Sequence, residues 1–500
     1  MSSRESYGLV EWYGNSGGHR CGYCKGATGN ISDGMWAHDL TVQNYQDLID
    51  RGWRRSGKYC YKPIMNETCC PHYTIKMAAL EFRMSKSHKK IIKQVNKYLI
   101  HGIKPGESKD ADHHGARDAP HSESGNAPTG ETPKVDGKKE RSATDLFESQ
   151  NPPLASGSAI EFMHKDETEG KVKTVRKGEG ADPNKPPCKK AKDIRLEKKK
   201  QKLLNTGKTL EDVEEMLKKT TSTSGDGKSL EDYLNEPSKA ENCVHKLEIK
   251  LIRSNPRKHA AFTDSYLESH QVFKKYQMSI HHEDECDCDL RSFNNFLVDS
   301  PLKESKGENK KEGTVSMGYG SFHQHYILDG KIVAVGVIDI LPYCTSSVYL
   351  YYHPDYSFLA LGTYSALQEI AFTRSLNKMD KELKYYYMGY YIHTCSKMRY
   401  KAQYYPSFLL CPETYTWHPI EKCLPKLDQN KYARFAPEGV DDKNLDVPED
   451  SITILFMRQL MTYDIYKTLN PKAKDAKTVK KYSQLVGKKV APKMMLLRSS

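Results

Sequence analysis

The middle of the chain, residues 102–241, limits what the rest of the protein can fold into. Charged and small polar residues dominate it, as in DADHHGARDAPHSESGNAPTGETPKVDGKKERS, and apolar periodicity is almost absent. Such a segment cannot bury enough apolar surface to offset the conformational entropy that ordering would cost. The sequence therefore predicts a long disordered insertion between two ordered parts, residues 1–101 and 242–500.

Composition and charge exclude some classes of protein. The first residues, MSSRESYGLVEWYG, lack the basic and apolar regions of a signal peptide, and no run of eighteen apolar residues occurs. We therefore expect no membrane span, a cytoplasmic monomer, and thirteen cysteines that are reduced rather than disulfide-bonded. The net charge of +13 suits RNA, although solubility explains it equally well. The basic stretch 185–192 fits a nuclear address, an RNA-contacting arm or a solvated linker.

Four cysteines near the N-terminus carry the sharpest chemical signal. Cys21 and Cys24 form a Cys-x-x-Cys turn, and the adjacent pair Cys69 and Cys70 follows after 44 residues. A Cys-x-x-Cys turn presents two thiolates on one side of a tight loop, as zinc or an iron–sulfur cluster requires. The adjacent second pair breaks the ordinary zinc-ribbon spacing. We predict a metal- or cluster-binding domain over residues 1–101, with helices near 45–51 and 87–99.

The C-terminal half alternates strand and helix patterns. Residues 331–340, KIVAVGVIDI, form the β-branched apolar run typical of a buried central strand. A second strand, a helix that opens at Gly362-Thr363 and a third strand follow, and their predicted bounds are 346–353, 362–375 and 384–391. This order predicts an α/β (α+β) domain that is acetyltransferase-like (GNAT-like), in which a splayed sheet opens a slot for an acyl donor. We place this domain at 242–440, followed by a helical segment and basic tail at 441–500.

Several segments, in this order, resemble those of the arginyl-tRNA–protein transferases. The similarity covers residues 5–100 and 242–430 and leaves the insertion unmatched. The segments that carry it are Gly14–Cys24, Cys69–Tyr73, Tyr276–His281, Gly318–Gln324, Ala334–Pro342, Ser346–Tyr352, Phe358–Tyr364, Met388–Ile392 and Lys397–Lys401.

The resemblance implies that arginine is transferred from Arg-tRNA to the α-amine of proteins that begin with Asp or Glu. In the N-degron pathway this addition marks a protein for ubiquitin-dependent degradation. The resemblance also implies a regulatory iron–sulfur cluster, with zinc on the same thiolates as the alternative. The ligands would be Cys21, Cys24, Cys69 and Cys70.

The chemistry of this reaction suggests where catalytic groups are needed. An arginyl ester is already activated, so positioning and donors aimed at the tetrahedral oxyanion can supply most of the acceleration. Gly362 and Thr363, at a strand-to-helix turn, are candidates to direct free N–H groups at that oxyanion or at the terminal ribose-phosphate. A capped helix that needs glycine for packing is the structural alternative.

Selection of an acidic N-terminus requires a cation. Lys397, Arg399 and Lys401 alternate, so on an extended segment they project to one side. Arg399 offers the bidentate fork that matches a carboxylate. Pairing with structural acids and contact with tRNA phosphate are the competing roles for these cations.

The remaining candidates are polar residues near the predicted strands. His281, His323 and His325 are candidate bases or tRNA contacts, although a lone histidine is commonly a packing residue. Tyr276 and Gln277 precede His281 in a Tyr-Gln-x-x-x-His stretch similar to that of the family, and we predict that all three bind substrate. The acidic candidates to anchor the arginyl guanidinium or the substrate ammonium are Asp339 and Glu369.

Two functions from other classes remain as alternatives. A CoA-dependent N-acetyltransferase would normally carry an Arg/Gln-x-x-Gly-x-Gly/Ala loop, whereas Leu359 and Tyr364 stand at two of the corresponding positions around Gly362. A non-enzymatic zinc-dependent RNA-binding protein explains the cysteines and the charge but not the C-terminal motifs.

Overall fold

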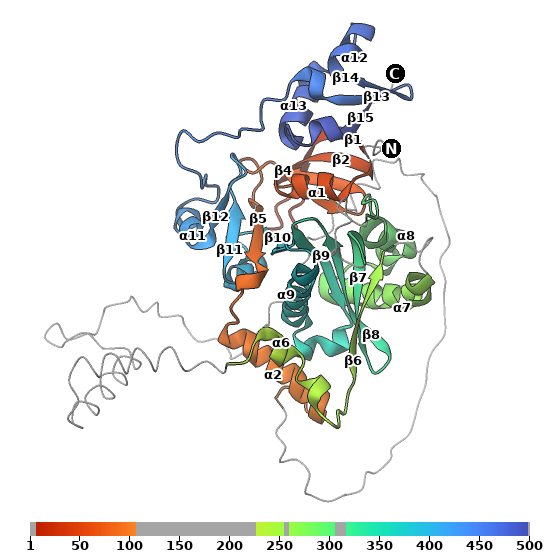
Figure 1. The fold of residues 1–500 in the computed structure, drawn as a ribbon, viewed down its shortest axis with the longest axis vertical. Helices are drawn as coiled ribbons and strands as arrows, with labels where there is room; N and C mark the ends of the chain where they lie inside the picture. The colour runs from red at the N-terminus through yellow and green to blue at the C-terminus, as the bar shows by residue number, and fades with distance from the viewer. Residues whose placement is uncertain (1–6, 107–226, 255–259, 306–316, 499–500) are drawn as a thin grey trace, which may run out of the picture. The chain divides into compact units, whose positions relative to one another are not determined.

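Two mixed β-sheets with flanking helices make up the described part of the protein (Figure 1). The computed structural model describes residues 7–106, 227–254, 260–305 and 317–498. The mixed α/β character agrees with the predicted α+β class. Most of the predicted insertion, together with its basic stretch, lies outside the described residues.

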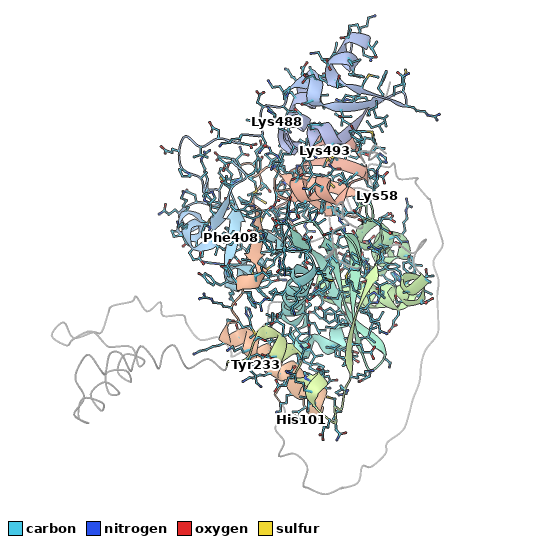
Figure 2. The ribbon with its side chains drawn as sticks, in the orientation of Figure 1. Lys58, His101, Tyr233, Phe408, Lys488 and Lys493 are labelled. Atoms are coloured by element: carbon cyan, nitrogen blue, oxygen red, sulfur yellow. The ribbon has the colours of Figure 1, made fainter. Side chains whose placement is uncertain are left out.

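The larger sheet has eight strands and carries the C-terminal half of the chain. An N-terminal strand, β5, is inserted in it between β10 and β11. Figure 2 labels Phe408 on β11, the strand that lies beside β5. The strand order is β12 (Trp417–Pro419), β11 (Ser407–Leu410), β5 (Tyr73–Ala78), β10 (Tyr385–Tyr391), β9 (Cys344–Tyr352), β8 (Lys331–Ile340), β7 (Gly320–Leu328) and β6 (Leu247–Arg253).

Local sequence patterns predicted the central elements of this sheet correctly. The apolar run 331–340 is β8, and all but its first residue are buried. The strands predicted at 346–353 and 384–391 are β9 and β10. The helix predicted at 362–375 is α9 (Leu361–Met379). Because β9, α9 and β10 form a parallel crossover, α9 packs directly against both strands.

Helices α7 (Ala260–Tyr276) and α9 cover opposite faces of the eight-stranded sheet. His323 and Gln324 are neighbours on β7, so their side chains point to opposite faces. The His323 ring packs on Phe262 of α7 at 5.0 Å. Gln324 accepts a hydrogen bond from Tyr326, whose hydroxyl also reaches the carbonyl of Ser365 on α9.

The smaller, seven-stranded sheet joins the two ends of the chain. Strand β1 pairs in parallel with β15 and antiparallel with β2. Helix α13 (Ala476–Val486) contacts β1, and α12 (Tyr463–Leu469) packs on β13 and β14. The strand order is β14 (Gln459–Thr462), β13 (Thr453–Phe456), β15 (Met494–Arg498), β1 (Gly8–His19), β2 (Asn30–Asp39), β4 (Tyr59–Pro63) and β3 (Arg54–Ser56).

These pairings correct the predicted division of the chain. Residues 1–101 are not a separate domain, because β5 belongs to the larger sheet and β1 pairs with β15, which joins the other N-terminal strands to the C-terminal ones in the smaller sheet. Residues 441–500 are not only a helical segment and a tail, because they supply three strands. Long-range strand pairing decides both boundaries, and the local sequence contains no signal for it. Among these C-terminal residues, Lys488 and Lys493 are exposed and labelled in Figure 2.

The shorter helices follow the predicted patterns. The helices predicted near 45–51 and 87–99 are α1 (Val42–Ile49) and α2 (Lys86–His101). The apolar stripe of α2, from Ile91 to Leu99, is buried, whereas Lys89 and Lys93 lie over the ring of Tyr233 at 5.7 and 5.6 Å. The remaining helices are α6 (Leu230–Leu234), α8 (Leu290–Phe293), α10 (Ser396–Arg399) and α11 (Ile420–Gln429). Within the described ranges, no helix is both long and apolar enough to span a bilayer.

Candidate active site

The neighbouring strands β9 and β10 separate along their length and open a cavity. They pair only where residues 385–387 meet residues 344–346. Beyond that point a cavity forms between Ser347–Leu350 on one strand and Met388–Tyr390 on the other. It holds about 700 Å³ of unfilled space, counting its mouth, and one face of α9 forms its floor. The predicted splayed sheet with a slot is therefore present as geometry.

Both walls of this slot carry a β-bulge. On β9, Val348 is the extra residue, because Ser347 and Tyr349 pair with consecutive residues of β8. On β10, a register shift against β5 lies between Tyr387 and Tyr390, and Gly389 there has φ +69°. A bulge leaves its extra residue outside the ladder, so backbone groups in both walls can face a ligand. Glycine adopts this left-handed conformation without the strain that a Cβ would add.

Two buried cations hold the β10 bulge from different elements. Lys401 donates to the carbonyls of Met388 and Tyr390, both at 2.8 Å. Arg54, from β3, donates to the carbonyl of Gly389 at 3.3 Å. In the part of the chain that the structure describes, neither cation forms an ion pair with a carboxylate. Burial, with the nearby charge of Arg54, lowers the pKa of Lys401 to about 7.

A second cavity opens on the same strands and shares part of the wall. Ser347–Tyr349, Gly389 and Tyr390 line both cavities. The second cavity is completed by β3, including Arg54, and by Phe296. The strand pair therefore borders two cavities, an arrangement that can hold two separately bound substrates.

Glu369 lines the floor of the slot from α9 and is only 1% exposed. Its carboxylate accepts a hydrogen bond from the Tyr386 hydroxyl at 2.7 Å and another from the side chain of Ser347. Among the described residues no cation pairs with it. Burial raises the pKa of Glu369 to about 7.

The structure separates the two residues predicted as oxyanion donors. Gly362 lines the slot, whereas Thr363 is absent from its lining. The Thr363 N–H already donates to the carbonyl of Ala360 at 3.0 Å, in the first turn of α9. The prediction of a free Thr363 amide is therefore wrong, because the left-handed Ala360 tightens that turn. Gly362 stays a candidate.

Two further predicted catalytic residues are buried and line neither cavity. His323 is fully buried between strand and helix, its Nε2 contacts the carbonyl of Leu297 at 3.0 Å, and burial lowers its pKa to about 4. Asp339 forms a buried ion pair with Arg55, with Oδ1 at 2.6 Å from Nη2. This placement corrects the expectation for both residues, because neither can touch a substrate. His325 is likewise buried.

The three alternating cations do not lie on an extended segment. Lys397 and Arg399 lie in α10, and Lys401 lies in the 3-10 turn that follows. The assumption that they project to one side is therefore wrong. Of the three, only Lys401 lines the slot, whereas the Arg399 side chain is 59% exposed and lies 3.8 Å from Asp428. Helical geometry splits the three because it turns about 100° per residue instead of alternating.

The Tyr-Gln-x-x-x-His residues come together behind the slot. Gln277 accepts a hydrogen bond from the Tyr349 hydroxyl at 2.7 Å, and Nε2 of His281 lies 3.3 Å from that hydroxyl oxygen. Tyr276 packs edge-on against Tyr349 and the His281 ring. Burial, with the charge of Lys397 second, lowers the pKa of His281 to about 4. Because Tyr349 lines both cavities, these residues position a wall of the site rather than line it.

The four N-terminal cysteines converge as predicted. Their Sγ atoms all lie within 4.8 Å of one another, and the Sγ atoms of Cys24 and Cys69 are 3.4 Å apart. Two thiolates on one tetrahedral ion lie about 3.8 Å apart, so the donor set fits a thiolate-bound metal centre. A backbone hydrogen bond at Gly26 is the main reason why the pKa of Cys24 falls to about 7, whereas burial raises that of Cys69 to about 12. The cluster can bind a metal.

The cysteine cluster packs directly on the wall of the slot. Cys21 and Cys70 are buried in one apolar cluster with Tyr390, Ile392 and Met398. Tyr390 and Met398 also line the slot. Any change in the cysteine centre can therefore move two residues that shape the candidate active site.

A third cavity, larger than the slot, opens elsewhere. It holds about 1350 Å³ between β4, the start of β5 and α13. Two of its cations are paired, Arg51 with Asp442 at 2.8 Å and Lys481 with Asp33 at 2.5 Å, whereas Lys62 donates to the carbonyl of Arg51. A charge-selective site needs uncompensated charge, which the slot between β9 and β10 offers and this groove largely does not.

Sequence reasoning missed several residues that line the two cavities. Arg54 stands in the short segment GWRRSG, where neither of its two arginines differs visibly from a surface cation. Nothing in the local pattern distinguishes such residues, because the slot forms from segments distant in sequence. They include Arg54, Tyr349, Met398 and Tyr404.

Comparisons with known proteins agree with these observations. A family model described as arginine-tRNA-protein transferase, N terminus, matches residues 19–90, and its C-terminus counterpart matches residues 268–411. The chain is 38% identical to arginyl-tRNA–protein transferase 1 of Drosophila melanogaster, over 99% of this chain and 100% of that protein. It is 34% identical to arginyl-tRNA–protein transferase 2 of Arabidopsis thaliana, over 87% of this chain and 79% of the relative. A shorter match, 36% identical over 20% of this chain and 38% of the relative, is to an aspartate/glutamate leucyltransferase of Campylobacter jejuni.

Proposed function

Because the chain belongs to the arginyl-tRNA–protein transferase family, we propose that arginine passes from tRNA to an acceptor amine in the slot between β9 and β10. The protein is an aminoacyltransferase of the N-degron pathway, and its substrates are Arg-tRNA and a protein. Membership of the family removes the acetyltransferase and the non-enzymatic RNA-binding protein as alternatives. We assign β8, β9, α9 and β10 as a GNAT-like core, an assignment supported by the splayed strand pair.

The two cavities suggest how the reactants meet. The tRNA 3′ end would enter along α9 past Gly362, and the acceptor would approach from the cavity beside β3. The neutral α-amine attacks the ester carbonyl and forms a tetrahedral intermediate. The bond from the carbonyl carbon to the ribose oxygen then breaks, and the proton lost by the amine is taken up by that oxygen, which leaves as the ribose hydroxyl. Bulged backbone at Val348 and Gly389 lies where N–H groups can meet the oxyanion. Holding both reactants in place is worth about 7–11 kcal/mol of the barrier.

Recognition of an N-terminal Asp or Glu would use the two cations at the β10 bulge. Arg54 lines the acceptor-side cavity and Lys401 lines the slot, and both bind carbonyls of residues 388–390. A carboxylate that reaches this junction would meet the Arg54 guanidinium and Lys401, neither of which has a carboxylate partner among the described residues. Because the pKa of Lys401 is about 7, a bound carboxylate would also favour its protonated form. This uncompensated positive charge beside the splayed strands is the observation that supports acidic specificity.

Exchange of Lys401 for methionine is expected to lower kcat/KM for an Asp-initiated peptide by about 10- to 100-fold, the worth of a charge-assisted hydrogen bond. The KM for Arg-tRNA should change little. Steady-state kinetics at saturating Arg-tRNA measure the effect. Arg399→Met is the matched control, and we expect less than about a threefold change because Arg399 points to solvent. A larger loss in the control than in the Lys401 variant would refute this assignment.

We further propose that the four cysteines hold an iron–sulfur cluster, as the resemblance to the family implies, with zinc as the alternative. The convergence of four Sγ atoms within 4.8 Å supports a metal centre of either kind. A bound centre would cross-link two segments that are 45 residues apart and keep Tyr390 and Met398 in place. Oxidation or loss of the cluster would then change the activity by displacing these two residues of the slot lining.

Exchange of buried Cys70 for serine is expected to abolish stoichiometric metal binding and reduce transfer by about tenfold or more, because metal ligation stabilises the fold locally. Anaerobic absorption spectra with iron, sulfide and zinc analysis distinguish the two centres. Exposed Cys286, outside the cluster, gives the control C286S with unchanged metal content. Stoichiometric zinc without a visible chromophore would exclude the iron–sulfur cluster.

The test of the proposed function is a direct transfer assay. Purified protein, under reducing and anaerobic conditions, is incubated with [¹⁴C]Arg-tRNA and peptides that start with Asp, Glu or Val. Labelled arginine should appear on the first two peptides and be absent from the third. Failure to label any peptide would reject the function, and labelling of the Val peptide would reject only the acidic specificity. The labelled product would then enter the ubiquitin-dependent degradation route that we propose for it.

A further inference from the structure

Glu369 is a buried carboxylate that pairs with no cation from the described ranges of the chain. Both its hydrogen-bond donors are neutral hydroxyls, those of Tyr386 and Ser347. Asp339, the other acidic candidate for a cationic substrate group, already pairs with Arg55. An unpaired buried carboxylate is costly, so its presence in a cavity points to a cationic ligand.

The surroundings of Glu369 keep its carboxylate at one end of the slot. It follows Gly362, Ser365 and Ala366 on one face of α9, at helical spacing, and all four line the cavity. A Cβ added to Gly336 on β8 would lie 2.9 Å from Glu369 Oε1. The absence of a side chain at Gly336 therefore leaves the space that the carboxylate occupies.

The walls near Glu369 suit a planar cation rather than an aliphatic chain. Tyr386, Tyr400 and Tyr404 line the same cavity. Aromatic faces attract guanidinium groups, and a carboxylate offers them a bidentate partner. Lys401, the other charged residue of the cavity lining, donates to two main-chain carbonyls and does not pair with Glu369.

We propose that Glu369 binds the guanidinium of the arginyl group carried by tRNA and so selects arginine as the amino acid that is transferred. This inference rests on the proposed function and adds to it the residue that determines the acyl donor. The α9 floor would then receive the arginyl side chain while its ester carbonyl lies between the bulges of β9 and β10. Glu369 acts here on binding and specificity, and it takes no part in bond making.

The test compares two aminoacyl-tRNAs. In E369Q, kcat/KM for Arg-tRNA should fall about 50-fold, because an amide supplies neither charge nor a second acceptor oxygen. With Leu-tRNA the low rate should stay the same or rise, so that the ratio of Arg-tRNA to Leu-tRNA use falls by at least about 50-fold. The matched control is Q368A, because Gln368 precedes Glu369 on α9, donates to the Tyr364 hydroxyl and lies outside the cavity lining. Its ratio should equal that of the wild type.

A binding measurement separates specificity from folding. Arginine amide should bind the wild-type protein in calorimetric titrations and bind E369Q at least tenfold more weakly, and E369D should lie between them. An equal loss with both aminoacyl-tRNAs, or unchanged binding of arginine amide, would overturn the role of Glu369. A wild-type protein that transfers no arginine would instead overturn the proposed function, so the two failures are distinguishable.

Discussion

Replacement of Arg55 by methionine is expected to lower the free energy of unfolding by about 3–5 kcal/mol. Arg55 binds Asp339 through two hydrogen bonds, Nε to Oδ2 at 2.9 Å and Nη2 to Oδ1 at 2.6 Å, and both side chains are almost fully buried. The variant leaves Asp339 as an uncompensated charge, with the Ser321 hydroxyl as a remaining donor at 2.6 Å. Urea denaturation followed by circular dichroism measures the loss.

A second substitution, at Asp339, separates the effect of the unpaired charge on stability from the effect of altered packing. The double variant R55M/D339L removes both charges and keeps most of the apolar volume, so it should recover most of the lost stability. Lys467→Met breaks an exposed ion pair with Glu449 and should cost less than about 1 kcal/mol. An R55M protein as stable as the wild type would show that the pair is not a structural support and would return Asp339 to the list of reactive groups.

The central strands and helix of the larger sheet were predictable because their signals are local. The apolar run of β8 and the helical pattern after Gly362 each lie within one segment. By contrast, the insertion of β5 beside β10 joins residues more than 300 positions apart, and no local pattern encodes such a pairing. The predicted domain boundaries were wrong where such long-range strand pairs form.

The candidate site shows the same division between local and distant information. The cysteine spacing identified all four members of the cluster, because two short motifs contain them. Alternation of Lys397, Arg399 and Lys401 suggested a strand, whereas the segment is helical and, of these three cations, buries only Lys401. Asp339 and Glu369 were equivalent candidates in the sequence. Their partners in the structure distinguish them. Asp339 pairs with Arg55, 284 residues away, and supports the fold, whereas Glu369 has a neutral tyrosine as its partner and stays available for a substrate.

The unpaired state of Glu369 has a consequence for stability that needs no substrate. Burial raises the pKa of Glu369 from 4.5 to about 7, so between these two values the native protein holds a proton that the unfolded chain has released. The free energy of unfolding should therefore fall as pH rises from 4.5 to 7, by about 3 kcal/mol from this group, and stay lowered above pH 7. E369Q lacks this titration, so its stability relative to the wild type should increase by that amount over the same window.

Urea denaturation of both proteins at intervals between pH 4.5 and 8 measures the difference directly, and contributions from other groups cancel in it. Exposed Glu382, which lies beside Lys384, supplies the control E382Q, whose difference from the wild type should stay flat. A flat difference for E369Q as well would mean that a cation already neutralises Glu369 in the free protein. Addition of arginine amide at pH 8 should stabilise the wild type and leave E369Q nearly unchanged, because a guanidinium supplies the charge that the buried carboxylate lacks.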